Sequence, residues 1–204
     1  MNRLWLARHA QTEWNVENRM QGHHDSPLTE LGHRQASALG QALKDKPLSA
    51  IFVSTAQRAQ RTAAYVHQFH PHIPFIPTND LREIHLGPWE GLTKAEIQQR
   101  WPNEVDLFWH HPAQFQAIEG GEDYRLLYQR LQRWWQTFFH SPQQGEWLVV
   151  SHGVTLQVLF LLLENRRLED LHRDQILAQC SLSLVEWETG HQPRLVFRNN
   201  TDHL

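Results

Sequence analysis

Four short apolar segments, separated by stretches with helical spacing, constrain the fold of this chain more than any other feature. They occupy residues 4–7, 50–53, 75–76 and 147–150. Strands that are apolar on both sides are typical of parallel sheets, whose two faces are covered by helices. The sequence therefore predicts an α/β fold, a three-layer αβα sandwich with a mostly parallel central sheet.

The connecting segments have the periodicity of helices. In 29–43, apolar residues recur at helical spacing, and Thr29 is a suitable N-cap. We also predict helices over 56–69, 93–101, 104–111, 123–139 and 154–163, and a β-hairpin from 182–187 and 194–198. No repeat, low-complexity segment or linker interrupts this pattern. A length of 204 residues suits one core, so we expect a single domain over 1–204.

Composition excludes several classes of protein. The formal net charge of -3 argues against sequence-blind nucleic-acid binding, and the one cysteine, Cys180, cannot form an internal disulfide. The longest apolar stretch, 154–163, is about half the length of a membrane span. The N-terminal apolar run breaks at Arg8, too soon for a signal-peptide core. We expect a cytoplasmic protein with no nucleic-acid or membrane partner.

Polar side chains follow each predicted strand at the point where it ends. They are Arg8 and His9 after the first strand, Ser54 and Arg58 after the second, Glu83 after the third, and Ser151 and His152 after the fourth. In open α/β sheets, ligands bind at the carboxyl ends of the strands. A parallel sheet would bring these groups together at one edge.

The chemistry of this set points to phosphate. Arginine offers a planar fork that matches phosphate oxygens, and helix N-termini after the strands add backbone N–H groups. A neutral histidine can attack phosphorus, and a carboxylic acid can protonate a leaving alkoxide. One histidine or arginine alone would be an ordinary surface residue. The combination at several strand ends indicates a phosphate-handling site that needs no metal.

Four separated motifs contain these residues, at 6–15 with a continuation to 29, at 53–63, at 81–91 and at 149–153. In composition and order they resemble the motifs of the histidine phosphatase superfamily, which includes the cofactor-dependent phosphoglycerate mutases. The resemblance spans nearly the whole chain. It implies the phosphoglycerate mutase-like form of the αβα sandwich.

The resemblance also implies a role for each residue. His9 would be the nucleophile that becomes phosphohistidine, and Glu83 would protonate the leaving group and then activate water. Arg8, Arg58 and His152 would hold the phosphoryl oxygens. The substrate-binding positions would be Asn15, Gln21, Gly22 and Gly153. The substrate would be a small phosphomonoester, with no cofactor and no metal.

One position departs from the family pattern. Ala10 stands where the family usually has glycine. If that position needs a positive φ, alanine costs about 1 kcal/mol or more. If the glycine serves close approach to phosphate, a methyl group would crowd the site. We expect an active enzyme in either case, because the nucleophile is intact.

The segment 84–120 is predicted to be a lid. Its fixed cations are Lys94 and Arg100, and its large side chains are Trp89, Trp101, Phe108, Trp109 and Phe115. Glu90-Gly91 resembles the phosphatase branch of the family. We therefore expect an aromatic lid that admits bulky or hydrophobic phosphomonoesters, unless these aromatics only pack the lid helices. The turn at 120–123 is expected to return the chain from the lid.

Other functions stay open at this stage. A phosphatase of broad specificity is favoured, and a phosphoglycerate mutase is the main alternative. The segments 3–6 and 87–90 also resemble α-ribazole phosphatases of cobalamin assembly. A non-catalytic phospho-ligand binding module is disfavoured, because binding needs neither His9 nor Glu83. The sequence does not distinguish a monomer from a homodimer.

The chain has 15 histidines, which raises the question of a metal site. His67, His70 and His72 cluster around Pro71, and adjacent pairs occur at 23–24 and 110–111. Adjacent residues rarely reach one metal, and the spacing of His67 and His70 fits adventitious zinc binding at a helix end. We expect no functional metal site.

Overall fold

The computed structural model describes residues 1–140, 144–173 and 176–204. Its described residues form one sheet with the strand order β3-β2-β4-β1-β5-β6. The strands are β1 (Asn2–Arg8), β2 (Leu48–Ser54), β3 (Phe75–Thr78), β4 (Glu146–Ser151), β5 (Leu182–Trp187) and β6 (Arg194–Asn200). The first four are parallel, while β5 and β6 add an antiparallel edge beside β1. The predicted fold class is confirmed.

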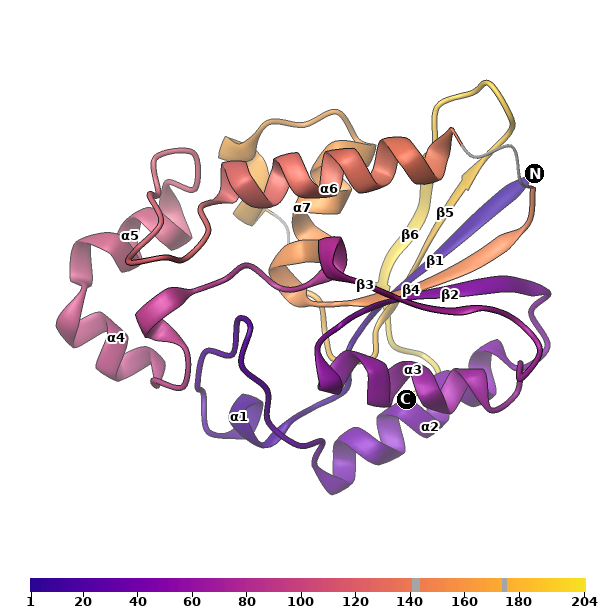
Figure 1. Cartoon of the computed structure of the whole chain (residues 1–204), viewed down its shortest axis with the longest axis horizontal. Helices are drawn as coiled ribbons and strands as arrows, with labels where there is room; N and C mark the ends of the chain where they lie inside the picture. Colours follow the sequence, from indigo (N-terminus) through magenta and orange to yellow (C-terminus); the bar gives the residue numbers. More distant parts are fainter. Residues whose placement is uncertain (141–143, 174–175) are drawn as a thin grey trace.

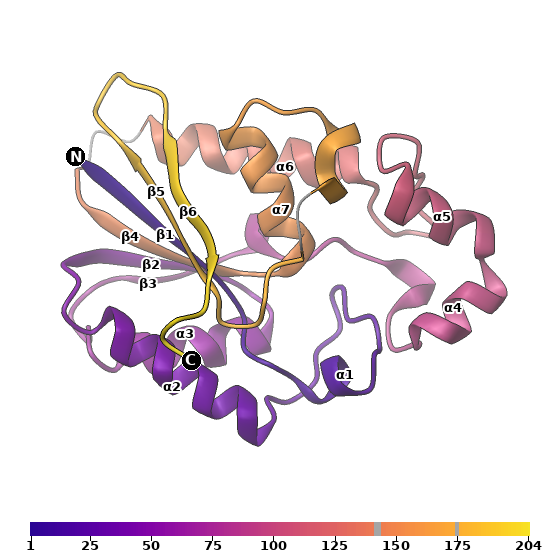
Figure 2. The same cartoon turned by 180° about the vertical axis from the view of Figure 1, so that it is seen from behind.

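Helices cover both faces of the sheet (Figures 1 and 2). Helices α2 (Glu30–Leu43) and α3 (Gln57–His67) pack on one face, and α6 (Tyr124–Phe139) and α7 (Gly153–Leu163) pack on the other. Strand side chains alternate between the two layers. Leu4 and Leu6 join the α6 and α7 core, whereas Trp5 and Ala7 join the α2 and α3 core. This double burial explains why the strands read as continuous apolar runs.

Side-chain caps start three of the predicted helices. The Thr29 hydroxyl accepts from Gly32 N at 2.9 Å at the start of α2. The Asp123 carboxylate accepts from Leu126 N at 2.8 Å at the start of α6. Thr93 caps α4 (Lys94–Arg100) with a capping box. The next helix, α5 (Pro102–His110), begins at its proline, two residues earlier than predicted, because a proline fits the first helical turn.

The segment 84–120 extends from the carboxyl ends of the strands (Figure 1). It contains η2 (Gly87–Trp89), α4 and α5. The short helix α1 (Glu13–Val16) lies on the same side of the sheet. The sequence pattern did not predict α1 or the short helices η1 (Asn79–Leu81) and η3 (Leu168–Arg173), because one or two turns of helix show no apolar periodicity.

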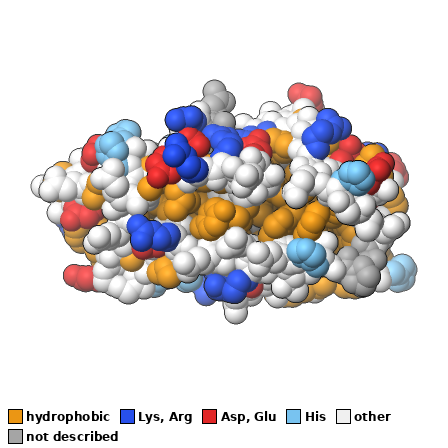
Figure 3. All heavy atoms as spheres, turned by 90° about the horizontal axis from the view of Figure 1, so that it is seen from above, with side chains coloured by type: hydrophobic (Ala, Val, Ile, Leu, Met, Phe, Trp, Pro, Cys, Tyr) orange, Lys and Arg blue, Asp and Glu red, His pale blue; other side chains and the backbone are white. Residues whose placement is uncertain are grey.

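The face that carries α6 keeps apolar surface. Figure 3 shows hydrophobic side chains gathered along the middle of this face. Leu126 is 48% exposed, and a groove beside α6 is lined by Phe52, Ile76, Phe138 and Trp147, among others. Within the part of the chain that the structure describes, no helix is both long and apolar enough to cross a lipid bilayer.

Candidate active site

The carboxyl ends of β1, β2 and β4 meet at one pocket of about 280 Å³. Its wall includes Arg8, His9, Arg58, Glu83 and Gly153. The residues come from segments up to 145 positions apart (153 minus 8), and the parallel strands bring them together. The convergence predicted from the strand ends is therefore present in the structure.

His9 lies just after β1 and is 3% exposed. Its Nδ1 lies 2.7 Å from the carbonyl oxygen of Ala10, a contact that requires Nδ1 to carry the proton. Burial, with the nearby charges of Arg58 and Arg8, holds the pKa of His9 well below its usual range. The ring is therefore neutral at pH 7, and Nε2 has a free lone pair. These are the properties of a nitrogen nucleophile.

Arg58 is buried in the first turn of α3 and is tied to the loop at 22–25. It donates to Asp25 Oδ1 at 2.6 Å, to His24 O at 2.6 Å and to Gly22 O at 2.8 Å. Asp25 also accepts from the backbone N of Arg58 at 3.3 Å. The carboxylate thus fixes both ends of the residue, and the guanidinium is oriented before any ligand binds.

Arg8, at the end of β1, donates to the carbonyl oxygen of Leu177. Burial lowers the pKa of both Arg8 and Arg58. The Nε atoms of both residues are buried without a hydrogen-bond partner among the described residues. Buried donors without partners cost free energy, and an anion would satisfy them. The two guanidiniums make this pocket suited to phosphate.

His152 is fully buried next to His9, with the two ring centroids 5.2 Å apart. Its Nε2 lies 2.7 Å from the hydroxyl oxygen of Ser54 at the end of β2. Burial, followed by the charge of Arg58, keeps the pKa of His152 well below its usual range. Its Nδ1 is buried without a partner among the described residues. The imidazole therefore adds a third orphaned polar atom close to His9.

Glu83 lines the pocket and contacts the N-terminus of α7. Its Oε1 accepts from Thr155 N at 2.9 Å and from Ile84 N at 3.0 Å and lies 2.8 Å from Thr155 Oγ1, and its Oε2 accepts from Val154 N at 3.1 Å. Free N–H groups in the first turn of a helix favour a carboxylate. Thr155 was not identified from the sequence, although its place in the first turn after His152 was a usable signal.

Asn15 and Gln21 both line the pocket, as predicted, but other contacts occupy part of each side chain. Asn15 Oδ1 accepts from Thr12 N and Thr12 Oγ1, both at 3.1 Å, in the capping box of α1. Gln21 Nε2 donates to Thr12 Oγ1 at 2.8 Å. The Asn15 side chain therefore both lines the pocket and caps α1, whereas the Gln21 amide bonds to Thr12 within the loop.

Gly22 and Gly153 also line the pocket, and of the two Gly22 alone has a steric reason to be glycine. Gly22 has a φ of +52°, and a Cβ there would lie 2.2 Å from Glu90 Oε1. A Cβ on Gly153 would lie 3.6 Å from the Arg8 guanidinium, which is ordinary contact. Gly22 is thus required by the backbone, whereas Gly153 leaves room at the start of α7.

Ala10 answers the question raised by the missing family glycine. Its φ is not in the left-handed region, and its side chain is fully buried in the α2 and α3 core. Its backbone N donates to Thr62 Oγ1 at 3.0 Å. The backbone strain and the crowding considered from the sequence are therefore both absent, because the methyl group points into the core and does not line the pocket.

The large aromatic residues of the segment 84–120 divide between the pocket and the core. Phe108 and Trp109 line the pocket, and Lys94 Nζ lies 5.7 Å from the Trp109 ring centroid. Trp89 and Phe115 are buried against Phe108, with ring centroids 5.4 and 5.1 Å from it. Trp101 packs partly buried against the same core. Phe108 and Trp109 therefore fit the prediction of an aromatic pocket wall. Trp89, Phe115 and Trp101 fit the alternative, in which the aromatic residues only pack the helices of this segment.

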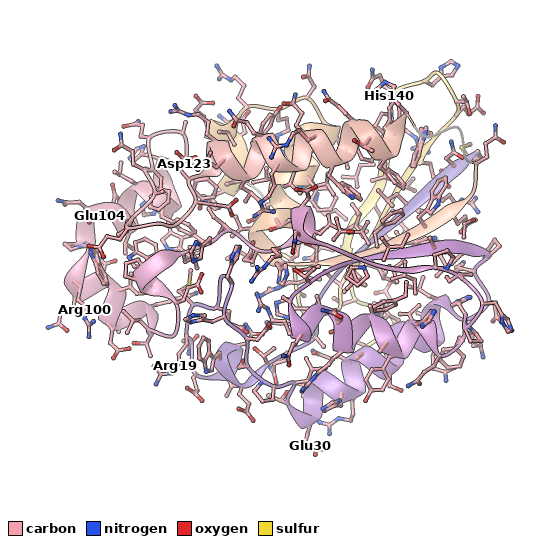
Figure 4. The ribbon with its side chains drawn as sticks, in the orientation of Figure 1. Arg19, Glu30, Arg100, Glu104, Asp123 and His140 are labelled. Atoms are coloured by element: carbon pink, nitrogen blue, oxygen red, sulfur yellow. The ribbon has the colours of Figure 1, made fainter. Side chains whose placement is uncertain are left out.

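The pocket rim contains further apolar and polar groups. Trp14, Met20 and Ile176 line it together with Arg19, which Figure 4 shows on the side of the molecule that carries α4. The Arg19 guanidinium donates to Glu17 Oε2 at 2.6 Å and to Gly91 O at 2.8 Å. Arg19 is therefore occupied by contacts within the protein.

The clustered histidines outside the pocket contact the backbone. His67 Nε2 lies 3.1 Å from Ile73 O, and His70 Nε2 lies 3.0 Å from Leu43 O. The first contact joins the end of α3 to the loop before β3, and the second joins the residues after α3 to the end of α2. Across residues 1–140, 144–173 and 176–204, no group of three or more His, Cys, Asp and Glu side chains is arranged to hold a metal.

Comparison with known proteins shows the family of this chain. The family model for the histidine phosphatase superfamily (branch 1) matches residues 4–201. The chain is 33% identical over 177 residues to 2,3-bisphosphoglycerate-dependent phosphoglycerate mutase of Bartonella bacilliformis, covering 82% of this chain and 84% of the relative.

Two solved structures are similar over almost their whole length. Bacillus stearothermophilus YhfR is 36% identical, with a TM-score of 0.93, covering 100% of this chain and 99% of that one. The α-ribazole phosphatase of Shigella flexneri is 27% identical, with a TM-score of 0.87, covering 97% of this chain and 96% of that one.

The fold and the site together define an α/β phosphoryl-transfer enzyme of the histidine phosphatase type. The chain belongs to the histidine phosphatase superfamily, branch 1. Its relatives include both mutases and phosphatases.

Proposed function

We propose that this protein is a phosphomonoester hydrolase that acts through a phosphohistidine intermediate on His9, with Glu83 as the proton donor. The observation that carries the proposal is the neutral, buried His9 beside orphaned polar atoms of Arg8, Arg58 and His152. Positioning and charge neutralisation are the main requirements of phosphoryl transfer. The site supplies both from side chains alone.

In the first step, His9 Nε2 attacks phosphorus and the bond from phosphorus to the leaving oxygen breaks. The carboxylic acid of Glu83 gives its proton to that oxygen, and the alcohol departs. Arg8, Arg58 and His152 hold the non-bridging oxygens. Because Nδ1 of His9 keeps its proton and its bond to Ala10 O, the ring keeps its orientation as charge develops.

In the second step, water attacks the phosphohistidine and the N–P bond breaks. The Glu83 carboxylate takes a proton from the water, which regenerates the acid, and phosphate leaves. The electron pair of the N–P bond returns to His9 Nε2. Each cycle consumes one phosphomonoester and one water and needs no co-reactant.

We infer a broad preference for substrates with an apolar body. Trp14, Phe108 and Trp109 line the pocket beyond His9 and Glu83. We also propose that the chain is one catalytic domain and that the segment 84–120 acts as its lid. The main alternative, a mutase, is supported by the phosphoglycerate mutase relative.

Turnover of p-nitrophenyl phosphate with excess EDTA tests the hydrolase. We expect metal-independent turnover, an acid-labile and base-stable phosphoenzyme, and loss of both in His9→Ala. His72→Ala, at an exposed histidine, is the matched control. Absence of turnover at every pH from about 5 to 8, the range in which His9 is expected to stay neutral, would refute the hydrolase.

A second experiment separates hydrolase from mutase. The enzyme is given 3-phosphoglycerate with 2,3-bisphosphoglycerate, alongside a panel of alkyl and aryl phosphates. We expect hydrolysis of the panel to be faster than isomerisation of phosphoglycerate. Faster isomerisation would identify a mutase.

A further inference from the structure

Hydrogen bonds to four consecutive backbone carbonyl groups fix the position of the segment that carries Glu83. Residues 80–83 include four consecutive C=O groups, and each accepts a hydrogen bond or contact from outside the segment. Asp80 O accepts from Arg130 at 2.6 Å, Leu81 O from Ser151 Oγ at 2.7 Å, and Arg82 O from Thr155 Oγ1 at 2.8 Å. The segment comprises the end of the short helix η1 and the residues after it, where carbonyl groups have no partner within the helix. Here all four carbonyl groups accept from donors of the protein, and these bonds fix the position of the segment 80–83.

Arg130, on α6, supplies the largest share of these bonds. Besides Asp80 O, its guanidinium donates to Arg82 O at 3.0 Å and to Glu83 O at 3.2 Å. Its remaining donors form a bidentate pair with Glu122, at 2.9 and 2.7 Å. The five N–H groups of the guanidinium therefore match five acceptor contacts. Arg130 does not line the pocket, and its side chain is only 11% exposed.

Glu122 fixes the orientation of Arg130. Its Oε2 also accepts from His85 N at 3.0 Å, and its own backbone N donates to His85 O at 2.7 Å. Although burial acts to raise the pKa of Glu122, the bonds and charge of Arg130 bring it below the usual value. Figure 4 shows the neighbouring Asp123 at the start of α6, where the chain returns from α5. The turn at 120–123 thus connects the segment 84–120 to the backbone around Glu83.

We propose that Arg130, held by Glu122, is the positioning residue for the proton donor Glu83. This inference rests on the proposed hydrolase function. Arg130 donates to the carbonyl oxygens of Arg82 and Glu83, which lie on either side of the Glu83 Cα atom. The backbone N–H groups at the start of α7 donate to the Glu83 carboxyl group. Without Arg130 the segment at 80–84 gains freedom, and the carboxyl group loses its alignment with the leaving oxygen. A misplacement of about 1 Å can cost on the order of a hundredfold in rate.

The test compares substrates that differ in their need for a proton. An alkyl phosphate requires protonation of its leaving oxygen, whereas p-nitrophenolate leaves with little help. We expect Arg130→Gln to lower kcat for the alkyl phosphate at least about tenfold more than kcat for p-nitrophenyl phosphate. Arg130→Lys keeps the charge but loses the planar fork of donors. The difference between its kcat losses on the two substrates should therefore be nearer to that of Arg130→Gln than to that of wild type. Arg133→Gln, at an exposed arginine of the same helix, is the matched control.

A purely structural role would give a different pattern. Loss of folded enzyme lowers both rates by the same factor, so equal losses on the two substrates would overturn the inference. Because Arg130→Gln can fold poorly, Glu122→Gln is measured in parallel, and it should show the same substrate pattern more weakly. The folded fraction of each variant is measured by circular dichroism and thermal unfolding.

A double variant provides the second criterion. In a Glu83→Gln background, Arg130→Gln should change the alkyl phosphate rate less than about threefold, because the group that it positions is already lost. Multiplicative losses would overturn the inference. Absence of a phosphohistidine in the wild-type enzyme would instead refute the proposed function and this inference with it. A phosphohistidine with equal losses would refute the role of Arg130 alone.

Discussion

Lowering the pH from 7 to 5 should destabilise the folded protein through two buried histidines, His9 and His152. Burial keeps the pKa of both His9 and His152 well below the usual value in the folded chain. In the unfolded chain each returns to about 6.5. Below that pH the unfolded state binds protons that the folded state does not. The stabilisation is therefore complete above the unfolded pKa and is lost as the pH falls.

The magnitude follows from proton linkage. One group that stays neutral when folded and titrates near 6.5 when unfolded removes about 1.9 kcal/mol of unfolding free energy between pH 7 and 5. Two such groups remove about 4 kcal/mol, from a total that is typically 5–15 kcal/mol. His23, whose pKa burial lowers to about 4, adds to the slope in the same direction. The lowered pKa of Glu122 does not contribute to the loss of stability between pH 7 and 5, because the stabilisation that it provides is lost only below about pH 4.5.

Urea unfolding at several pH values between 7 and 5 measures this slope. The buffers must contain no phosphate, because an anion bound to the folded state would add its own stabilisation. In His9→Gln the loss between pH 7 and 5 should shrink by about 1.9 kcal/mol. His72→Gln, at an exposed histidine, should leave the slope unchanged. A wild-type stability that does not fall over this range, or a His9→Gln slope equal to wild type, would contradict the reasoning.

Three further predictions concern single positions. Ala10→Gly should cost about 1 kcal/mol of stability without raising kcat, because it removes a buried methyl group and frees the unfolded chain; urea unfolding and kinetics check this, and a higher kcat would show that Ala10 impairs the site. Gly22→Ala should cost at least about 1 kcal/mol at its positive φ and displace Glu90, so kcat/KM should fall as the Gly22–Arg58 bond shifts. Wild-type kinetics in Gly22→Ala would argue against that coupling. Trp109→Ala should raise KM for aryl phosphates more than for small alkyl phosphates, and a uniform change in KM would exclude an aromatic wall.

The local sequence pattern was enough to predict most of the helices and strands and the polar side chains at the strand ends. Strands buried on both faces give unbroken apolar runs, and Thr29, Thr93 and Asp123 begin helices through their own side chains. Arg8 and His9 could be assigned because they directly follow a strand. The convergence of these side chains could be predicted from the sequence because a parallel sheet has the carboxyl ends of its strands at one edge.

Pairings between distant segments could not be read from local pattern. Nothing local places β1 between β4 and β5. The Asp25–Arg58 ion pair joins residues 33 positions apart, and the contact of Arg130 with Glu83 joins residues 47 positions apart. Nor does helical spacing tell which lid aromatics face the pocket, because that depends on how the lid helices pack. Trp109 lines the pocket for this reason, whereas Trp89 is buried.

The anchored carbonyls at 80–83 limit how this enzyme can change. An insertion or deletion of one residue there would move each oxygen away from its donor and turn Glu83 away from α7. The described segment 94–120 is held mainly by apolar packing, so a change in its length would disturb fewer hydrogen bonds. Length variation in the segment 94–120 would therefore alter which substrates fit the proposed site, while the distance from Glu83 to His9 stays fixed by the 80–83 segment.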